Sequence, residues 1–202
     1  MRYKTLFLLI LAAMCSFSAS AVDTAEQILQ RCADKINKAP SITIKFTLNY
    51  GESRSDCQLI LSREKYRLSS KDVEVWYDGE TQWSYSAADK EVTITDPTPD
   101  ELLECNPFAI INNYKTAYTF RRLSGEKDEI ELTAKSKMSN IRRAVITVNA
   151  STGLPSKLIV TMANGRTFTA NVSSAVEGKT LPGSTFIYNK VQFPAKTIID
   201  LR

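Results

Sequence analysis

The stretch Ser41-Ile42-Thr43-Ile44-Lys45-Phe46-Thr47-Leu48-Asn49-Tyr50 decides the fold class of this chain. Large apolar or aromatic residues occupy every second position, and polar residues occupy the positions between them. This period of two predicts a β-strand with one face against a core and the other face in water.

A helix is expected immediately before this strand. Its apolar residues recur at the spacing of one helical face: Ile28, Leu29, Cys32, Ala33 and Ile36. Asp23 followed by Glu26 is similar to a capping box at the start. We expect the helix to end near Lys38, because Pro40 cannot continue it.

Strand-like segments continue after the first strand, interrupted once by a helical stretch. The further strands are expected at residues 57–62, 65–69, 73–77, 81–86, 91–95, 118–123, 129–134, 142–148, 154–162 and 166–174. Asp78-Gly79 is the strongest hairpin signal among them. Thr98-Pro99-Asp100-Glu101 starts a helix that Pro107 should kink or split. The pattern predicts a mainly β fold, a single curved sheet of about 11 antiparallel strands with helices packed on it.

The N-terminus has the three zones of a secretory signal peptide. Arg2 and Lys4 precede an apolar run at residues 6–14, and Ala19-Ser20-Ala21 provides a cleavage site. We expect residues 1–21 to be removed and residues 22–202 to form one domain in an export compartment. Acylation of Cys15 is an alternative, although Met14 is larger than the residue that normally precedes a lipoprotein cysteine. Cleavage would remove two of the 26 basic residues, which leaves 24 basic against 22 acidic residues and a net charge of +2. So small a net charge does not favour nucleic-acid binding.

The chain lacks most of the residue patterns that support catalysis. It contains no histidine, which excludes Ser-His-Asp and Cys-His pairs and leaves no zinc-ligand pattern. A glycosidase-like pair among the acids at positions 96, 100, 101 and 104 is disfavoured, because acids near a helix start stabilise its dipole. Cys32, Cys57 and Cys105 either include one disulfide or are buried apolar residues. We expect no enzyme activity, no cofactor and no metal.

Three segments resemble the LolA family of outer-membrane lipoprotein carriers. Residues 78–85, Asp-Gly-Glu-Thr-Gln-Trp-Ser-Tyr, are similar to the family hairpin Asp-Gly-Lys-Thr-x-Trp-x-Tyr. Residues 106–111, Asn-Pro-Phe-Ala-Ile-Ile, resemble its Pro-Phe-aliphatic segment. Residues 61–68 resemble the family's basic, aromatic turn, although the proline of that turn is missing in this chain. Residues 191–202 resemble the ending of a shorter branch of the family.

The resemblance implies an incomplete antiparallel β-barrel covered by an α-helical lid, with an apolar cavity that takes the acyl chains of lipoproteins. The lid helix would contribute Ile28, Leu29 and Ile36. The expected cavity residues are Ile44, Phe46, Leu48, Leu61, Trp83 and Phe108. An arginine beside the basic turn would hold the lid shut, with Arg63 as the first candidate and Arg67 as the second.

The resemblance also implies a role and partners. The protein would be a periplasmic monomer that takes lipoproteins from an inner-membrane releasing complex to an outer-membrane receptor. Two rivals stay open: a sensor or interaction module on the same fold, and a carrier of free lipids. Periodicity alone does not separate them, because a sheet face that is filled by helices has the same pattern as one that encloses a cavity.

Overall fold

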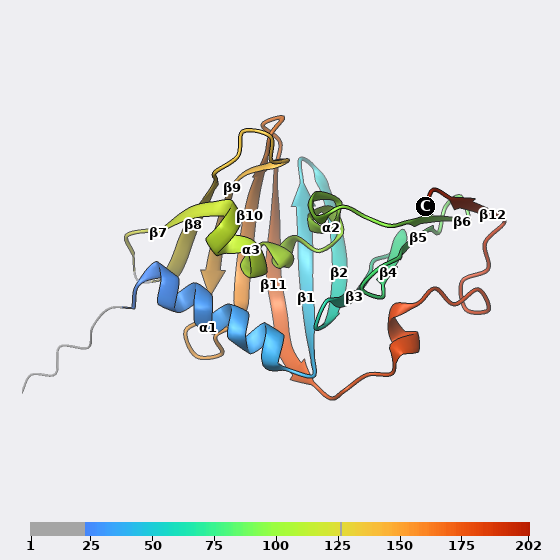
Figure 1. Ribbon diagram of the computed structural model, residues 1–202, viewed down its shortest axis with the longest axis horizontal. Helices are drawn as coiled ribbons and strands as arrows, with labels where there is room; N and C mark the ends of the chain where they lie inside the picture. The colour runs from blue at the N-terminus through green and yellow to red at the C-terminus, as the bar shows by residue number, and fades with distance from the viewer. Residues whose placement is uncertain (1–22, 126) are drawn as a thin grey trace, which may run out of the picture.

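The computed structural model describes residues 23–125 and 127–202, so the predicted signal peptide lies outside the described residues. Twelve strands form one sheet in the order β12-β6-β5-β4-β3-β2-β1-β11-β10-β9-β8-β7 (Figure 1). The first six strands are β1 (Ser41–Tyr50), β2 (Ser53–Ser62), β3 (Lys65–Ser69), β4 (Val73–Tyr77), β5 (Gln82–Ser86) and β6 (Glu91–Thr95). The others are β7 (Tyr118–Arg122), β8 (Asp128–Ala134), β9 (Ile141–Val148), β10 (Pro155–Met162), β11 (Thr167–Gly178) and β12 (Thr197–Asp200).

The sheet is open, because β12 and β7 are its two edges and do not pair with each other. A mainly β fold built as an incomplete barrel with helices is therefore confirmed. The expected count of about 11 strands omitted β12, which pairs with β6 in parallel while the other neighbours are antiparallel. All four residues of β12 are exposed, so this strand has no buried and exposed alternation that could reveal it.

Helix α1 (Ala25–Lys38) ends where expected but begins one residue away from the predicted cap. Thr24 rather than Asp23 is the cap: its hydroxyl accepts from the Gln27 amide, and the Gln27 side chain accepts from the Thr24 amide. The Asp23 carboxylate instead accepts from Arg31 at 2.7 Å. The capping box therefore uses a hydroxyl and an amide side chain.

The mid-chain helical stretch follows its predicted signals. Helix α2 (Pro99–Cys105) starts with a capping box between Thr98 and Glu101. Pro107 splits the stretch, which continues as the short 3₁₀ helix η1 (Pro107–Ala109) and then as α3 (Ile110–Ala117). A second 3₁₀ helix, η2 (Gly183–Phe186), lies in the C-terminal segment.

The helices cover one face of the sheet, called here the inner face (Figure 1). Helix α1 places its whole apolar stripe in the main core, and α3 adds Ile110, Ile111 and Tyr114. From the sheet, the alternating residues Ile42, Ile44 and Phe46 of β1 complete this core. Burial of these side chains is the main stabilising contribution to the fold.

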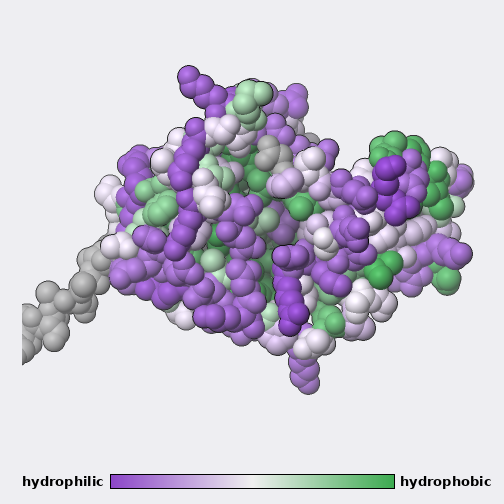
Figure 2. Space-filling model, in the orientation of Figure 1, coloured by the Kyte–Doolittle hydropathy of each residue, from purple (hydrophilic) through white to green (hydrophobic). Residues whose placement is uncertain are grey.

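The outer face has its own apolar cluster over β4, β5 and β6. Trp76, Tyr85 and Val92 are buried there, and Phe193 of the C-terminal segment contacts both Trp76 and Tyr85 ring against ring. Residues 179–202 thus cover part of the outer face, whereas α1 to α3 cover the inner one. Figure 2 shows hydrophobic surface at the end of the molecule where the C-terminus lies, where Ile198 is exposed.

Within residues 23–125 and 127–202, none of the helices has both the length and the apolar character that crossing a membrane requires.

Candidate functional site

An apolar cavity of about 140 Å³ lies between the inner face of the sheet and the end of α2. Strands β1, β2, β3 and β11 form its floor, and α2 with η1 forms its roof. The lining residues are Phe46, Leu48, Tyr50, Cys57, Leu68, Glu104, Cys105, Pro107 and Phe168. Most of these side chains are apolar, so the cavity suits a hydrocarbon group better than a polar one.

A smaller apolar pocket of about 20 Å³ lies on the other side of α2. Its lining residues are Leu103, Glu104, Asn140, Ile141, Met162 and Phe168. Glu104 and Phe168 line both spaces, so they form the partition between them. A displacement of α2 away from the sheet would join the two into one longer apolar groove.

Residues 99–109, called here the flap, comprise α2 and η1 and are held less firmly than α1. Helix α1 has a buried apolar stripe and polar contacts along its length: Glu26 pairs with Lys115, Asn37 bonds Asn112, and Lys35 pairs with Glu177. In the flap, by contrast, Leu103, Pro107 and Phe108 are buried while Leu102 and Cys105 are only partly buried, and no ion pair between described residues joins the flap to another element. Fewer buried contacts mean a lower free energy of local opening, so the flap is the part of the cover most able to move.

Asn106 marks the junction between α2 and η1 and weakens the closed position. Its side-chain Oδ1 is buried and has no hydrogen-bond partner among the described residues. A buried acceptor without a partner costs about 1–3 kcal/mol. Because opening of the flap would let water reach this oxygen, the cost falls on the closed form.

The tyrosine and the two cysteines beside the cavity are neutral groups. The Tyr66 hydroxyl donates to the Gln82 side chain at 2.5 Å, and burial raises the pKa of Tyr66. Burial likewise raises the pKa of the Cys57 thiol and that of the Cys105 thiol. A cysteine nucleophile needs a lowered pKa, so these thiols line the cavity as weakly polar groups. Among the described residues, no group of three or more acidic or cysteine side chains is placed to hold a metal ion.

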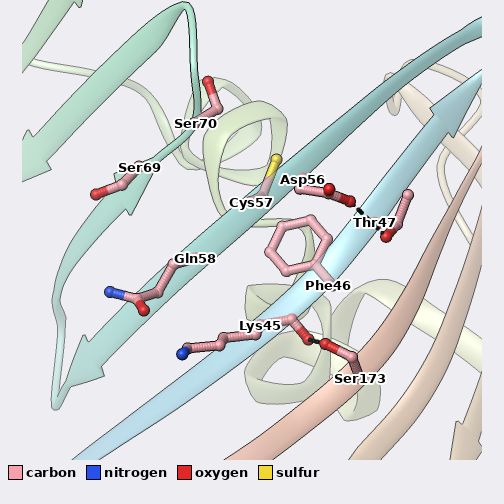
Figure 3. A pocket seen from close by; sticks show the side chains of 9 residues that line it. All are labelled: Lys45, Phe46, Thr47, Asp56, Cys57, Gln58, Ser69, Ser70 and Ser173. Carbon is pink, nitrogen blue, oxygen red and sulfur yellow. Dashed lines mark hydrogen bonds between the residues drawn. The ribbon is translucent and has the colours of Figure 1, made fainter.

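A larger hollow of about 360 Å³ lies on the outer side of β1 and β2, but its lining is mostly polar (Figure 3). Thr47 donates to Asp56 at 2.7 Å, and Ser173 donates to the backbone oxygen of Lys45 at 3.1 Å. Phe46 and Cys57 line both this hollow and the apolar cavity. Volume therefore does not identify the site; the chemistry of the lining favours the space under the flap.

Two of the six predicted cavity residues line the cavity, and a third packs against it. Phe46 and Leu48 line the cavity, and the Phe108 ring meets the Phe46 ring edge to face at 5.5 Å. Ile44 and Leu61 are buried in the adjoining core rather than at the cavity surface. The predicted lid residues Ile28, Leu29 and Ile36 are likewise in the core, where α1 fills the inner face.

Trp83, predicted as a cavity residue, and Arg67, predicted as the second lid-locking candidate, both lie on the outer face of the sheet. Trp83 pairs in register with Trp76, and both belong to the outer cluster. Arg67 donates to the Glu74 carboxylate at 2.5 Å and lies over the Trp76 ring, with 5.6 Å to its centroid. The physical reason is the alternation along the strand. In β5 the polar residues Gln82, Ser84 and Ser86 face inward, so Trp83 faces outward.

Arg63 lies at the turn between β2 and β3, on the edge of a hollow beside the C-terminal end of α1. It donates no hydrogen bond to that helix or to another described residue. Its predicted lid-locking role stays a prediction.

The other lining residues were not predicted as cavity residues: Tyr50, Cys57, Leu68, Glu104, Cys105, Pro107 and Phe168. Phe168 and Leu68 belong to strands with the same period of two as β1. Only the folded sheet shows that Phe168 pairs with Tyr50 and Leu68 pairs with Leu59, which places both on the inner face. Cys57 and Cys105 are both free and line the same cavity.

Comparison with known proteins supports this picture at the level of family and fold. The sequence matches the family described as "Outer membrane lipoprotein carrier protein LolA" over residues 14–166, more than half of the chain. No curated protein sequence matches the chain.

Solved structures with similar folds share little sequence with this chain. An uncharacterized conserved protein from Thermus thermophilus has a TM-score of 0.59 at 10% identity, covering 87% of this chain and 98% of its own. MucB has a TM-score of 0.50 at 15% identity; the match covers 82% of this chain and 62% of MucB, so this chain spans less than two thirds of it. A LolA superfamily protein from Nitrosomonas europaea has a TM-score of 0.44 at 12% identity, and the match covers 83% of this chain and 99% of that protein.

Proposed function

The chain belongs to the family of the outer membrane lipoprotein carrier protein LolA, and from this premise we propose that it binds the acyl chains of lipoproteins beneath the flap. The proposed carrier works in the periplasm and transports its cargo from the inner to the outer membrane. Its partners are an inner-membrane lipoprotein-releasing complex and an outer-membrane receptor.

The apolar cavity under a weakly held cover carries this proposal. Sites for small molecules usually have volumes of about 300–1,000 Å³. The cavity of about 140 Å³ is therefore too small for an acyl chain while the flap is closed. Movement of α2 would join the cavity to the neighbouring pocket, and an acyl chain would then cover the apolar surface that the flap leaves.

The energetics suit a carrier that must release its cargo. Burial of one acyl methylene contributes about 0.8 kcal/mol, so ten contribute about 8 kcal/mol, which corresponds to micromolar affinity before the costs of association. Opening the flap exposes Leu103, Phe108 and part of Leu102, at about 1.5–3 kcal/mol for each fully exposed side chain, which offsets a large part of that gain. The closed empty form and the open loaded form are then close in free energy, and a partner that prefers one of them shifts the equilibrium.

The proposed cycle needs no chemical step and no cofactor. Cargo uptake and release are changes in burial, and the cavity is lined by neutral thiols and apolar side chains, with the exposed Glu104 at its edge. The protein acts as a monomer in this proposal, because a single chain supplies both the floor and the cover of the cavity.

The filled inner face under α1 favours a second candidate, an interaction module that recognises a protein partner through its surface. Residues of α1 and α3 occupy this part of the inner face with buried side chains such as Leu29 and Ile110. In an interaction module the flap would stay closed, and acyl compounds would not bind. A carrier of free lipids would instead bind acyl chains whether or not a protein is attached.

Variants on opposite faces of β1 test the proposal. Leu48→Arg places a charge in the cavity, and we expect affinity for a fluorescent acylated peptide to fall more than about tenfold. Thr43→Arg, on the outer positions of the same strand, is the matched control and should leave the affinity unchanged. Equal affinities of both variants and the parent protein would contradict a site under the flap. Equal binding of the acylated peptide and a free fatty acid would favour the free-lipid carrier.

A further inference from the structure

A second hollow, of about 490 Å³, lies at the opposite end of α1 from its capping box. Three parts of the chain meet there: the C-terminal end of α1, the turn between β2 and β3, and the segment around η2. The lining residues are Asn37, Lys38, Ala39, Pro40, Ser62, Arg63, Lys65, Thr180, Leu181, Gly183 and Phe186. None of them lines the cavity under the flap, so the two sites are separate.

The charges around this hollow have one sign. Lys38, Arg63 and Lys65 line it, and no carboxylate does. Lys38 pairs with Asp34 at 3.1 Å. Arg63 and Lys65, by contrast, form no ion pair or side-chain hydrogen bond with any residue in the described part of the chain. Glu64 stands between them in sequence but is not part of the lining.

The dipole of α1 accounts for only part of this arrangement. A helix C-terminus attracts cations, and Lys35 and Lys38 in the last turn satisfy that preference. Arg63 and Lys65 come from a different element and donate no hydrogen bond to the helix carbonyls. The end of α1 already has its own lysines. Arg63 and Lys65 therefore remain available to bind an external anion.

The backbone at Arg63 is unusual for its residue type. Its φ angle is 55°, in the left-handed region where glycine is normally favoured. A non-glycine residue in this region costs about 1–2 kcal/mol. Ser62 pairs with Lys65, so Arg63 occupies a two-residue hairpin turn in which positive φ is usual and glycine or asparagine is the common residue. The turn thus keeps a guanidinium at a position where glycine would be more stable.

We propose that this hollow binds a small molecule that carries a phosphate group, either free in solution or as the headgroup of a lipid. The planar guanidinium of Arg63 presents paired donors that match phosphate oxygens, and Lys65 adds a compact charge. A phosphate monoester carries up to about two negative charges near neutral pH, which complements several cations better than a single carboxylate does. The volume lies within the range of small-molecule sites, and Leu181 and Phe186 give the organic part an apolar surface.

Calorimetric titration of the purified protein with glycerol 3-phosphate tests this site. Arg63→Gly removes the guanidinium while it suits the positive φ, so this variant should fold, and Lys65→Gln removes the second charge. Each should weaken binding about tenfold. Lys71→Gln, at an exposed position in the turn between β3 and β4, is the control with an equal change of charge and should leave binding unchanged.

A parallel flotation assay separates the two sources of the phosphate. Vesicles that contain phosphatidic acid, whose headgroup is the same phosphate monoester, should retain the protein if the headgroup is the ligand, whereas vesicles of phosphatidylglycerol with equal surface charge should not, and Arg63→Gly should abolish the difference. Saturable binding of glycerol 3-phosphate alone assigns the site to a free phosphorylated molecule. Absence of binding in both assays, or equal weakening by Lys71→Gln, would overturn the proposal. The variants at Leu48 and Thr43 report acyl binding separately, so failure of the phosphate site and failure of the proposed carrier function remain distinguishable.

Discussion

Replacement of Leu103 by alanine should open the flap while the sheet stays folded. Leu103 is the buried leucine of α2, at 7% exposure, and it lines the small pocket against Ile141, Met162 and Phe168. Truncation of a buried leucine to alanine costs about 2–5 kcal/mol. The low end, about 2 kcal/mol, applies here because the side chain lies at the edge of the core beside an existing pocket.

This loss falls on the closed form of the flap, because an open flap has already left the core. A change of about 2 kcal/mol raises the open population about thirtyfold while the open form is a minority. Apparent affinity for an acyl ligand rises with the population of the competent form, so we expect it to increase by up to the same factor.

Hydrogen exchange measured by mass spectrometry and titration with a fluorescent acylated peptide together provide the assay. Amides of residues 99–109 should exchange faster in Leu103→Ala, while amides of β1 and β2 keep their rates. Leu132→Ala is the control: Leu132 is fully buried in β8, so this variant should lower global stability without an affinity gain. Uniform acceleration of exchange over the whole chain, or weaker acyl binding in Leu103→Ala, would refute the reasoning.

Three further predictions concern other parts of the molecule. Arg67→Ala leaves the largely buried Glu74 carboxylate without its partner and removes the cation from the Trp76 and Phe193 rings, so urea denaturation should show a loss of about 2 kcal/mol, and Arg67→Lys should lose less. An unchanged urea midpoint would contradict that role. The hydrogen bonds from Arg143 and then Arg121 hold the pKa of Glu131 below its ordinary value of 4.5. A lowered folded pKa stabilises the protein above pH 4.5, and this contribution is lost as the pH falls through the folded value. The urea midpoint of Glu131→Gln should therefore depend less on pH below 4.5 than that of the parent, and parallel curves would argue against it. Burial raises the pKa of the Cys32 thiol to about 12, so alkylation should modify Cys57 well before Cys32. Acyl ligand should slow the labelling of Cys57, and equal labelling with and without ligand would place the ligand elsewhere.

The sequence was most informative where local chemistry determines local structure. Alternation along residues 41–50 predicted β1 because a half-buried strand imposes a period of two. Thr98 and Glu101 predicted the start of α2, and Pro107 predicted its interruption, because caps and prolines act within one helical turn.

Long-range packing decided what the sequence could not reveal. In β4 the consecutive residues Val75, Trp76 and Tyr77 are all buried, so no alternation identifies the inner face. The strand register places Trp83 and Arg67 on the outer face, and the C-terminal segment buries that face with Phe193, which no local pattern predicts. The extent of the cavity depends on how α2 sits over β1 and β11, which no local pattern encodes.

Native mass spectrometry of the protein purified from a periplasm without detergent tests the central claim most directly. The carrier proposal predicts bound mass that fragments into an acylated protein or peptide, and it predicts that Leu48→Arg loses this mass while Thr43→Arg keeps it. An empty protein that also fails to bind added acyl ligands would contradict the claim.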